Sequence, residues 1–185
     1  MSLKKIVILF SGEGSNLENL IKKLHQKSVT VVGAITNNPD AKGIQKAKNL
    51  GIGVTILDHK EFNSREAFDT KLVEIIQSLE VDLTVLAGFM RILTPVFTGQ
   101  IKAINIHPSL LPLFKGANAL ERSFESKMKV GGVSVHYVVT EIDAGEIIFQ
   151  KCFDKSDMDF STFKKNIQAC EYEIFPKAVI SSLNL

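Results

Sequence analysis

The sequence predicts an α/β fold: a Rossmann-like, three-layer arrangement with a mostly parallel central sheet, helices on both of its faces and an antiparallel strand pair in the C-terminal half. In the first half, short segments that are apolar throughout alternate with amphipathic helical segments. This pattern is typical of parallel strands buried on both faces. The chain has 185 residues, 45% of them hydrophobic and 23% charged, and it contains no Gly/Ser-rich linker. We therefore predict one globular domain over residues 1–185.

The predicted elements of the first half follow from apolar runs and from apolar residues three or four positions apart. Asn63 to Glu66 resembles a capping box that starts a helix, and Gly51 is expected to end one in the left-handed conformation. In chain order the predictions are a strand at 5–10, a helix starting at Ser15 or Asn16, a strand at 29–36, a helix at 41–50, a strand at 54–57, a helix after residue 64 and a strand at 83–86.

The second half is less regular. We predict a strand at 103–107, a helix at 119–126, two strands at 132–139 and 146–153 that form the antiparallel pair, and a final helix at 161–183. Pro176 lies inside the last segment and is expected to end or kink that helix. The sequence leaves open whether the Leu111-Pro112 peptide bond is cis.

Composition excludes several classes of function. The formal net charge of +2 provides no general attraction to nucleic acid or to a membrane. The first apolar run is too short for a signal peptide or a membrane span, so we expect a cytoplasmic protein. Cys152 and Cys170 show no C-x-x-C spacing, and the four histidines form no i, i+4 pair, so we predict neither a disulfide framework nor a metal site.

A polar run at the end of one predicted strand points to acyl-transfer chemistry. Asn105 and His107 are two positions apart, so both side chains project to the same side of the strand. An amide N–H and a protonated imidazole can stabilise an oxyanion together. Asp143 is 36 positions beyond His107, and a carboxylate beside the imidazole would favour its charged form. We predict these three residues as the catalytic group.

A glycine-rich turn follows the first strand. Gly12-Glu13-Gly14-Ser15-Asn16 leads into the first helix, where free backbone N–H groups and the helix dipole favour an anion. The turn lacks the Gly-Lys-Ser/Thr of a Walker loop, and Leu17 occupies the third small position of a dinucleotide fingerprint. We therefore expect a monophosphate here, and Glu13 must then point to solvent. The alternative is a tight strand-helix connection without a ligand.

Five ordered motifs carry a resemblance to a known family. The chain resembles the phosphoribosylglycinamide formyltransferases, folate-dependent enzymes of purine biosynthesis, along nearly its whole length. The motifs are Ser11 to Leu17, Ser64-Arg65-Glu66, Leu86 to Leu93, Asn105 to Pro112, and Ser134-Val135-His136 leading to Asp143. The resemblance implies a formyltransferase fold and transfer of a formyl group from 10-formyltetrahydrofolate, as co-substrate, to phosphoribosylglycinamide. It implies small-molecule substrates, no metal, and a monomer or homodimer.

The resemblance also implies binding residues. The nucleotide would contact Gly14, Ser15, Asn16, Gln168 and Glu171, and the folate would contact Arg65, Met90, Arg91, Ile92, Leu93, Asn105, Val139, Thr140, Glu141, Ile142 and Asp143. For Arg65 the alternative is a first-turn helix residue facing water. For Gln168 and Glu171 it is an exposed helix face. Cys170 and Tyr172 depart from the family pattern.

Three histidines are interpreted as non-catalytic. His136 lies inside an alternating strand and is read as structural, and His25 and His59 are read as surface residues. Two related enzymes remain as alternatives: a methionyl-tRNA formyltransferase, which would need an additional RNA-binding domain, and a formyltetrahydrofolate hydrolase. A non-catalytic nucleotide- or folate-binding module is the alternative of another class, and the complete catalytic trio speaks against it.

Overall fold

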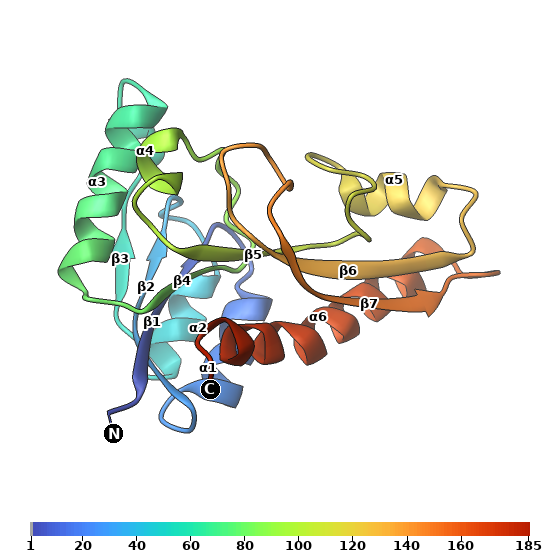
Figure 1. Ribbon diagram of the computed structural model, residues 1–185, viewed down its shortest axis with the longest axis horizontal. Helices are drawn as coiled ribbons and strands as arrows, with labels where there is room; N and C mark the ends of the chain where they lie inside the picture. The colour runs from blue at the N-terminus through green and yellow to red at the C-terminus, as the bar shows by residue number, and fades with distance from the viewer. Residues whose placement is uncertain (1) are drawn as a thin grey trace.

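The computed structural model describes residues 2–185 and is built on one seven-stranded sheet with the strand order β3-β2-β1-β4-β5-β6-β7 (Figure 1). The strands are β1 Lys4–Phe10, β2 Val29–Thr36, β3 Val54–Ile56, β4 Leu83–Leu86, β5 Ala103–His107, β6 Val130–Tyr137 and β7 Ile147–Asp154. The helices are α1 Ser15–Leu24, α2 Gly43–Asn49, α3 Arg65–Ser78, α4 Pro95–Thr98, α5 Ala119–Glu125 and α6 Phe160–Ser182, with a 3-10 turn, η1, at His59–Glu61.

The sheet has the predicted mixture of strand directions. Strands β3, β2, β1, β4 and β5 pair in parallel, whereas β5 with β6 and β6 with β7 are antiparallel. The predicted fold class is therefore confirmed. The boundaries of most elements lie within two residues of the predictions, and η1 and α4 were not predicted.

Two apolar clusters hold the layers together. Along β1, Ile6, Ile8 and Phe10 pack into a cluster with α1, α2 and α6, while Val7 and Leu9 pack into a second cluster with α3 and α4. Alternate residues of a strand point to opposite faces, so a strand that is apolar throughout is buried on both sides. Each such side chain contributes about 1.5–3 kcal/mol when fully buried. The continuous apolar runs of the sequence thus specify the three layers.

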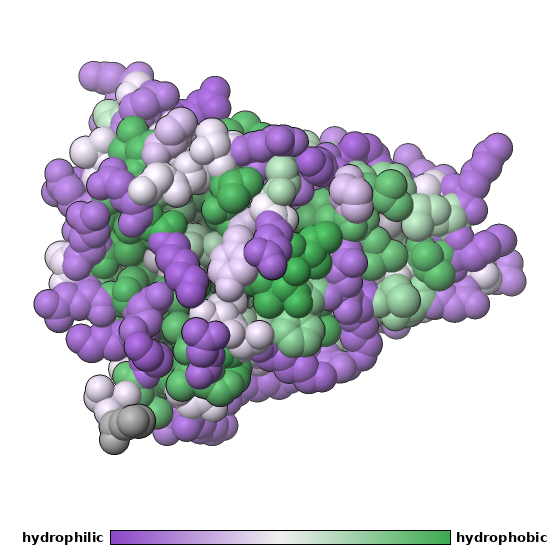
Figure 2. Space-filling model, viewed as in Figure 1, coloured by the Kyte–Doolittle hydropathy of each residue, from purple (hydrophilic) through white to green (hydrophobic). Residues whose placement is uncertain are grey.

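One face of the molecule shows many polar side chains. Figure 2 shows hydrophilic side chains along most of the outline of this face and a group of hydrophobic side chains near its middle. Among residues 2–185, no helix combines the length and the apolar composition needed to cross a membrane.

Helix α3 begins one residue later than a capping box at Asn63 requires. Ser64 is the N-cap, and its Oγ accepts a hydrogen bond from the Ala67 N–H at 3.0 Å. Glu66 therefore occupies the second helical position, so the predicted Asn63 to Glu66 box is wrong. Gly51 has φ +77° just after α2, as the predicted left-handed C′ residue.

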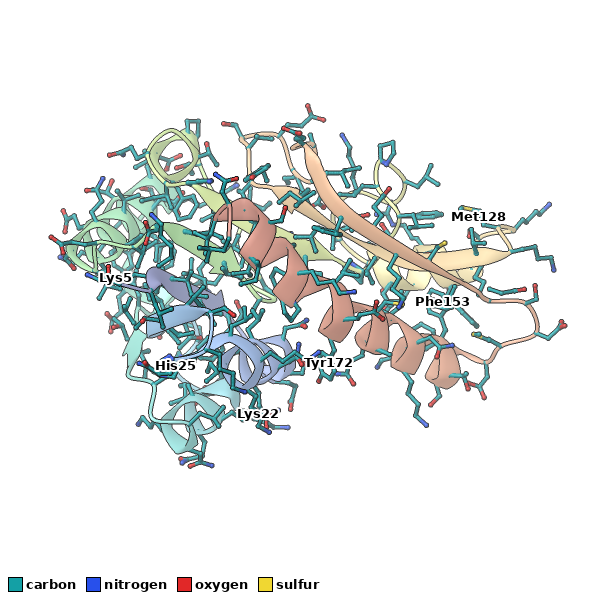
Figure 3. The ribbon with its side chains drawn as sticks, turned by 60° about the horizontal axis from the view of Figure 1, so that its bottom comes forward. Lys5, Lys22, His25, Met128, Phe153 and Tyr172 are labelled. Atoms are coloured by element: carbon teal, nitrogen blue, oxygen red, sulfur yellow. The ribbon has the colours of Figure 1, made fainter. Side chains whose placement is uncertain are left out.

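Helix α6 continues past Pro176, so of the two predicted effects of this proline, an end or a kink, the end of the helix is wrong. Proline has no N–H to donate to the carbonyl four residues earlier, which here belongs to Tyr172. That carbonyl instead accepts hydrogen bonds from Lys23 Nζ at 2.8 Å and Asn19 Nδ2 at 3.2 Å, both on α1. Figure 3 shows Tyr172 on the side of α6 that faces α1. Tertiary contacts thus replace the hydrogen bond that the proline removes.

The order of the parallel strands places a crevice between β1 and β4. The chain leaves β1 toward β2 and leaves β4 toward β5, in opposite directions, and ligands of open α/β sheets bind at the carboxyl ends of strands at such a point. The loops after β1 and β4 meet there, because the Ser11 N–H donates to the Gly88 carbonyl at 3.0 Å and the Met90 N–H donates to Ser11 Oγ at 2.7 Å.

Candidate active site

Strand β5 and the loop between β6 and β7 bring the three predicted catalytic residues to one edge of the sheet. Asn105 and His107 project from the same side of β5, and Asp143 reaches them from the loop with φ +52°. Asp143 Oδ2 lies 3.2 Å from His107 Nδ1 and accepts a hydrogen bond from the Gly116 N–H at 2.8 Å. Only 6% of the His107 side chain and 10% of the Asp143 side chain are exposed. The pair is therefore well shielded from water.

A fourth residue, His136, joins this cluster. It lies directly opposite Asn105 in the antiparallel register of β5 and β6. Its Nε2 atom is 3.3 Å from Asn105 Nδ2 and 3.4 Å from Asp143 Oδ1, and its Nδ1–H donates to the Tyr137 carbonyl at 2.9 Å. The sequence reading placed His136 in the structural framework and missed this contact. The signal that could have found it is the register, because directly opposed residues share one face.

The cluster occupies the side of β5 and β6 that faces away from α6. Ile104 and Ile106 pack into the apolar cluster that contains α6, so Asn105 and His107 point to the opposite face. The loops after β5 and β6 cover that face in place of a helix. Polar side chains can therefore be buried here, with backbone groups such as the Gly116 N–H as partners.

Both ring nitrogens of His107 face oxygen atoms. Nδ1 faces Asp143, and Nε2 lies 2.9 Å from the Phe114 carbonyl. Only the doubly protonated imidazolium can donate to both. Burial is nevertheless the largest influence on the pKa of His107 and lowers it, against the upward effects of Asp143 and of the Phe114 carbonyl. The ring is therefore mainly neutral at pH 7 and has hydrogen-bond acceptors ready for a second proton.

The carboxyl group of Asp143 stays ionised. Burial pushes its pKa upward, but hydrogen bonds from His136 and the Gly116 N–H, with the nearby imidazole of His107, together hold the pKa below its usual value. An ionised carboxylate beside a histidine favours the charged imidazole. The two residues thus form an acid-base pair in which the carboxylate supports proton uptake by His107.

The glycine turn lies along the same edge of the sheet. Gly14 has φ +69° and precedes α1, and a Cβ added to it would lie 2.5 Å from the Gly43 Cα. The glycine is therefore required by backbone conformation and by close packing against α2, whichever ligand binds. Glu13 points outward, as required, and pairs with Lys42 at 2.8 Å.

Asn16 and Glu171 are brought together from distant parts of the chain. Asn16 Nδ2 donates to Glu171 Oε2 at 2.9 Å and so connects the glycine turn to α6. Burial raises the pKa of Glu171, and the Asn16 hydrogen bond only partly opposes it. Asn16 Oδ1 is buried without a hydrogen-bond partner among residues 2–185. An unpaired acceptor beside a buried carboxyl group is suited to the hydroxyl groups of a ligand.

A cavity of about 470 Å³ opens above the glycine turn. Its walls come from the turn at Ser11 to Asn16, the end of β2, η1 and the loop after β4. Asn105, His107 and Asp143 are not among its lining residues, so the cavity and the polar cluster are separate parts of one edge. Among residues 2–185 no group of three His, Cys, Asp or Glu side chains has the spacing of a metal site.

The predicted folate residues include four exposed apolar side chains, Met90, Ile92, Val139 and Ile142, which we call the apolar rim. Met90 is 78% exposed and Ile92 52% exposed, while Leu93 is buried. The Arg91 guanidinium lies 5.1 Å from the centre of the Phe68 ring. Val139 and Ile142 are exposed on the loop that carries Asp143, as are Thr140 and Glu141.

Two of the predicted binding residues are not drawn into this site. Arg65 is an exposed first-turn residue of α3, which matches the water-facing alternative for this side chain. Gln168 is exposed on α6, one turn before the half-buried Glu171. Leu111-Pro112, which the sequence left open, is a cis peptide bond.

Comparison with known proteins places this geometry in a family. Residues 4–179 match the family model described as formyl transferase. The chain is 36% identical over 184 residues to the phosphoribosylglycinamide formyltransferase of Haemophilus influenzae, covering 96% of this chain and 86% of that protein. It is also 39% identical over 180 residues, 95% of this chain, to the trifunctional purine biosynthetic protein adenosine-3 of Gallus gallus, and it spans only 18% of that protein's length.

Solved structures agree with these relatives. The crystal structure of phosphoribosylglycinamide formyltransferase from Campylobacter jejuni superimposes with a TM-score of 0.94 and 55% sequence identity, over 97% of each chain. The glycinamide ribonucleotide transformylase 1 from Symbiobacterium toebii superimposes with a TM-score of 0.91 and 33% identity, over 96% of this chain and 86% of that one. With its sheet, its Asn-His-Asp edge and a family match over nearly all of its length, the chain belongs to the formyl transferase family.

Proposed function

We propose that the protein transfers the formyl group of 10-formyltetrahydrofolate to the amine of phosphoribosylglycinamide, which gives formylglycinamide ribonucleotide and tetrahydrofolate in de novo purine biosynthesis. The observation that carries the proposal is the His107–Asp143 pair beside Asn105 on β5, which only β4 separates from β1 and the anion-suited turn that follows it. Relatives named phosphoribosylglycinamide formyltransferase support the choice of acceptor. Residues 1–185 would act as one formyltransferase domain.

The reaction proceeds by direct transfer. The free amine of the nucleotide attacks the formyl carbon, and a C–N bond forms while the carbonyl electrons move to oxygen. The Asn105 amide N–H and protonated His107 stabilise this oxyanion. The bond from the formyl carbon to the folate nitrogen then breaks, His107 delivers a proton to that nitrogen, and the proton lost by the attacking amine balances the step. No covalent enzyme intermediate is required.

Two contacts of the site must change for this chemistry. His107 Nε2 lies 2.9 Å from the Phe114 carbonyl oxygen, and Asn105 Nδ2 lies 3.3 Å from His136 Nε2. Substrate oxygens would replace these partners, and Asp143 would hold the charge that His107 acquires. His136 then acts as a positioning residue, because it contacts both Asn105 and Asp143.

The two substrates would occupy neighbouring parts of the edge. The backbone N–H groups of Gly14, Ser15 and Asn16 would hold the phosphate at the start of α1, with Glu171 and Gln168 toward the ribose. The apolar rim of Met90, Ile92, Val139 and Ile142 fits a flat heterocycle, and Arg91, or Arg65 from farther out, would meet its carboxylates. Orienting two substrates in this way can contribute several kcal/mol to the lowering of the barrier.

The remaining expectations are part of the same proposal. The partners would be small molecules, with no nucleic acid or membrane involved, and the protein would be a cytoplasmic monomer or homodimer that needs no metal. The formal net charge of +2 supports the absence of a nucleic-acid partner, because it provides only a weak attraction to a phosphate backbone.

An acceptor assay tests the proposal. Purified protein would be given 10-formyltetrahydrofolate with phosphoribosylglycinamide, with methionyl-tRNA or without an acceptor, and the release of tetrahydrofolate would be followed. We expect release only with phosphoribosylglycinamide, and a loss of at least about 10²-fold in kcat for His107→Ala. Transfer to methionyl-tRNA at a comparable kcat/KM would overturn the acceptor. Equal release without any acceptor would identify a hydrolase, and no release at all would leave a binding module.

A further inference from the structure

His59 lines the cavity that opens above the glycine turn. It comes from η1, a segment distant from that turn in the sequence. The sequence reading placed it on the surface, but it is half-buried on η1 and lines the cavity of about 470 Å³. Of the described residues that line this cavity, His59 is the only one whose side chain can carry a positive charge. The one carboxylate on the wall, Glu13, points outward to Lys42. An anion in the cavity therefore has a single candidate for a side-chain cation.

The His59 ring is held in a defined orientation. Its Nδ1–H donates to the Asn37 carbonyl at 2.9 Å. Asn37 is fixed in turn, because its Oδ1 accepts a hydrogen bond from Ser11 Oγ at 2.5 Å at the end of β1. Asp58 Oδ1 is 3.8 Å from Nδ1, too far for a hydrogen bond, and accepts instead from the Lys60 N–H at 3.0 Å.

The opposite nitrogen of the ring is available to a ligand. With Nδ1–H engaged by the backbone, Nε2 is the remaining hydrogen-bonding atom, and it has no hydrogen-bond partner within residues 2–185. Asn16 also lines the cavity, and its Oδ1 is buried without a hydrogen-bond partner among residues 2–185. Two polar atoms from distant segments thus lack partners around one cavity, which indicates a polar ligand there.

We propose that His59 is a further binding residue for the nucleotide substrate, and that its Nε2–H donates a hydrogen bond to the phosphate group. The inference rests on the proposed function. Backbone N–H groups at the start of α1 would bind one side of the phosphate, and His59 would bind the other as a charge-assisted donor. The Ser11 to Asn37 hydrogen bond couples the two walls, since Ser11 begins the glycine turn and Asn37 holds the His59 ring.

Calorimetry with phosphoribosylglycinamide tests the assignment in the full-length protein. We expect His59→Ala to raise Kd about 10-fold, which corresponds to about 1.4 kcal/mol, while kcat at saturating substrates stays within about twofold. His59→Gln is a second variant that preserves the size of the side chain and is expected to weaken binding less. Lys60→Ala is the matched control, because Lys60 is an exposed cation on the same turn that does not line the cavity.

Inorganic phosphate identifies the contacted group. Used as a competitor of the nucleotide, it should show an inhibition constant that rises by a similar factor in His59→Ala. Unchanged nucleotide affinity in His59→Ala would overturn the inference, and so would weaker nucleotide binding with unchanged phosphate inhibition, which would place the contact on the ribose. If the unaltered protein bound phosphoribosylglycinamide but did not formylate it, the proposed function would be refuted. The effect of His59→Ala on Kd would still test the binding assignment.

Discussion

Replacing Asp143 with asparagine isolates the electrostatic contribution of the carboxylate to catalysis. The substitution keeps the size of the side chain and its hydrogen bond to the Gly116 N–H, and it removes the charge 3.2 Å from His107 Nδ1. At that distance and an effective dielectric constant of about 20, two unit charges interact by about 5 kcal/mol, an upper limit. A loss of about 2.7 kcal/mol already corresponds to a 10²-fold slower reaction, so we expect kcat/KM to fall by at least about 10²-fold.

The pH dependence gives a second, independent readout. His107 must be protonated to act as the acid, so kcat/KM falls as pH rises above the pKa of His107. Asp143 raises that pKa, and burial lowers it. Without the carboxylate the pKa of His107 drops further, and the alkaline fall in kcat/KM should begin at lower pH in Asp143→Asn than in the unaltered enzyme.

Steady-state kinetics between about pH 5 and 9 would measure both effects, with Glu146→Gln as the matched control. Glu146 is exposed just before β7, so its replacement makes the same change in charge outside the buried cluster. We expect the control to keep normal rates and a normal profile. If Asp143→Asn stayed within about threefold of the unaltered kcat/KM and its alkaline limb did not move, the assigned role of Asp143 would be refuted.

Three further substitutions test other parts of the structure. Burial raises the pKa of Glu171, so its ionised carboxylate lowers the stability of the fold once pH rises through that pKa. Glu171→Gln should therefore raise Tm by about 2–4 °C near pH 8 and by less near pH 5. The same substitution should weaken nucleotide binding in calorimetry. Lys155 is buried and donates to carbonyl groups at the end of α5, so Lys155→Ala should lower the free energy of unfolding in urea by about 2–3 kcal/mol, whereas the exposed Lys164→Ala should change it by less than about 0.5 kcal/mol. Gly14→Ala should lower Tm and the affinity for both substrates, because its Cβ would meet Gly43; a loss confined to the nucleotide would show that packing is not the limiting factor.

Local patterns in the sequence were sufficient for much of the fold. The mainly apolar runs of β2 and β4 predicted the limits of these strands, because a strand buried on both faces is mainly apolar. Gly51 was predicted as a left-handed residue after α2 for a reason that is equally local. Asn105 and His107 share one side of β5 by strand periodicity alone.

Local patterns could not predict the contacts of residues whose neighbours come from distant segments of the chain. His136 appeared structural until the register of β5 and β6 placed it opposite Asn105. His59 appeared to be a surface residue until η1 folded against the end of β2. Pro176 remained inside α6 because side chains of α1 satisfy the carbonyl that it leaves free.

The glycine turn shows both kinds of information at one position. The sequence by itself determined that a tight turn joins β1 to α1, because glycine tolerates a positive φ such as the +69° of Gly14. It also determined that backbone N–H groups are free there, because the first N–H groups of a helix have no partner within the helix. Only the tertiary structure decided that Gly14 also packs against Gly43 and that Asn16 reaches Glu171 across the molecule. Backbone conformation depends on neighbours along the chain, whereas packing, hydrogen-bond partners and pKa shifts depend on which segments the fold brings together.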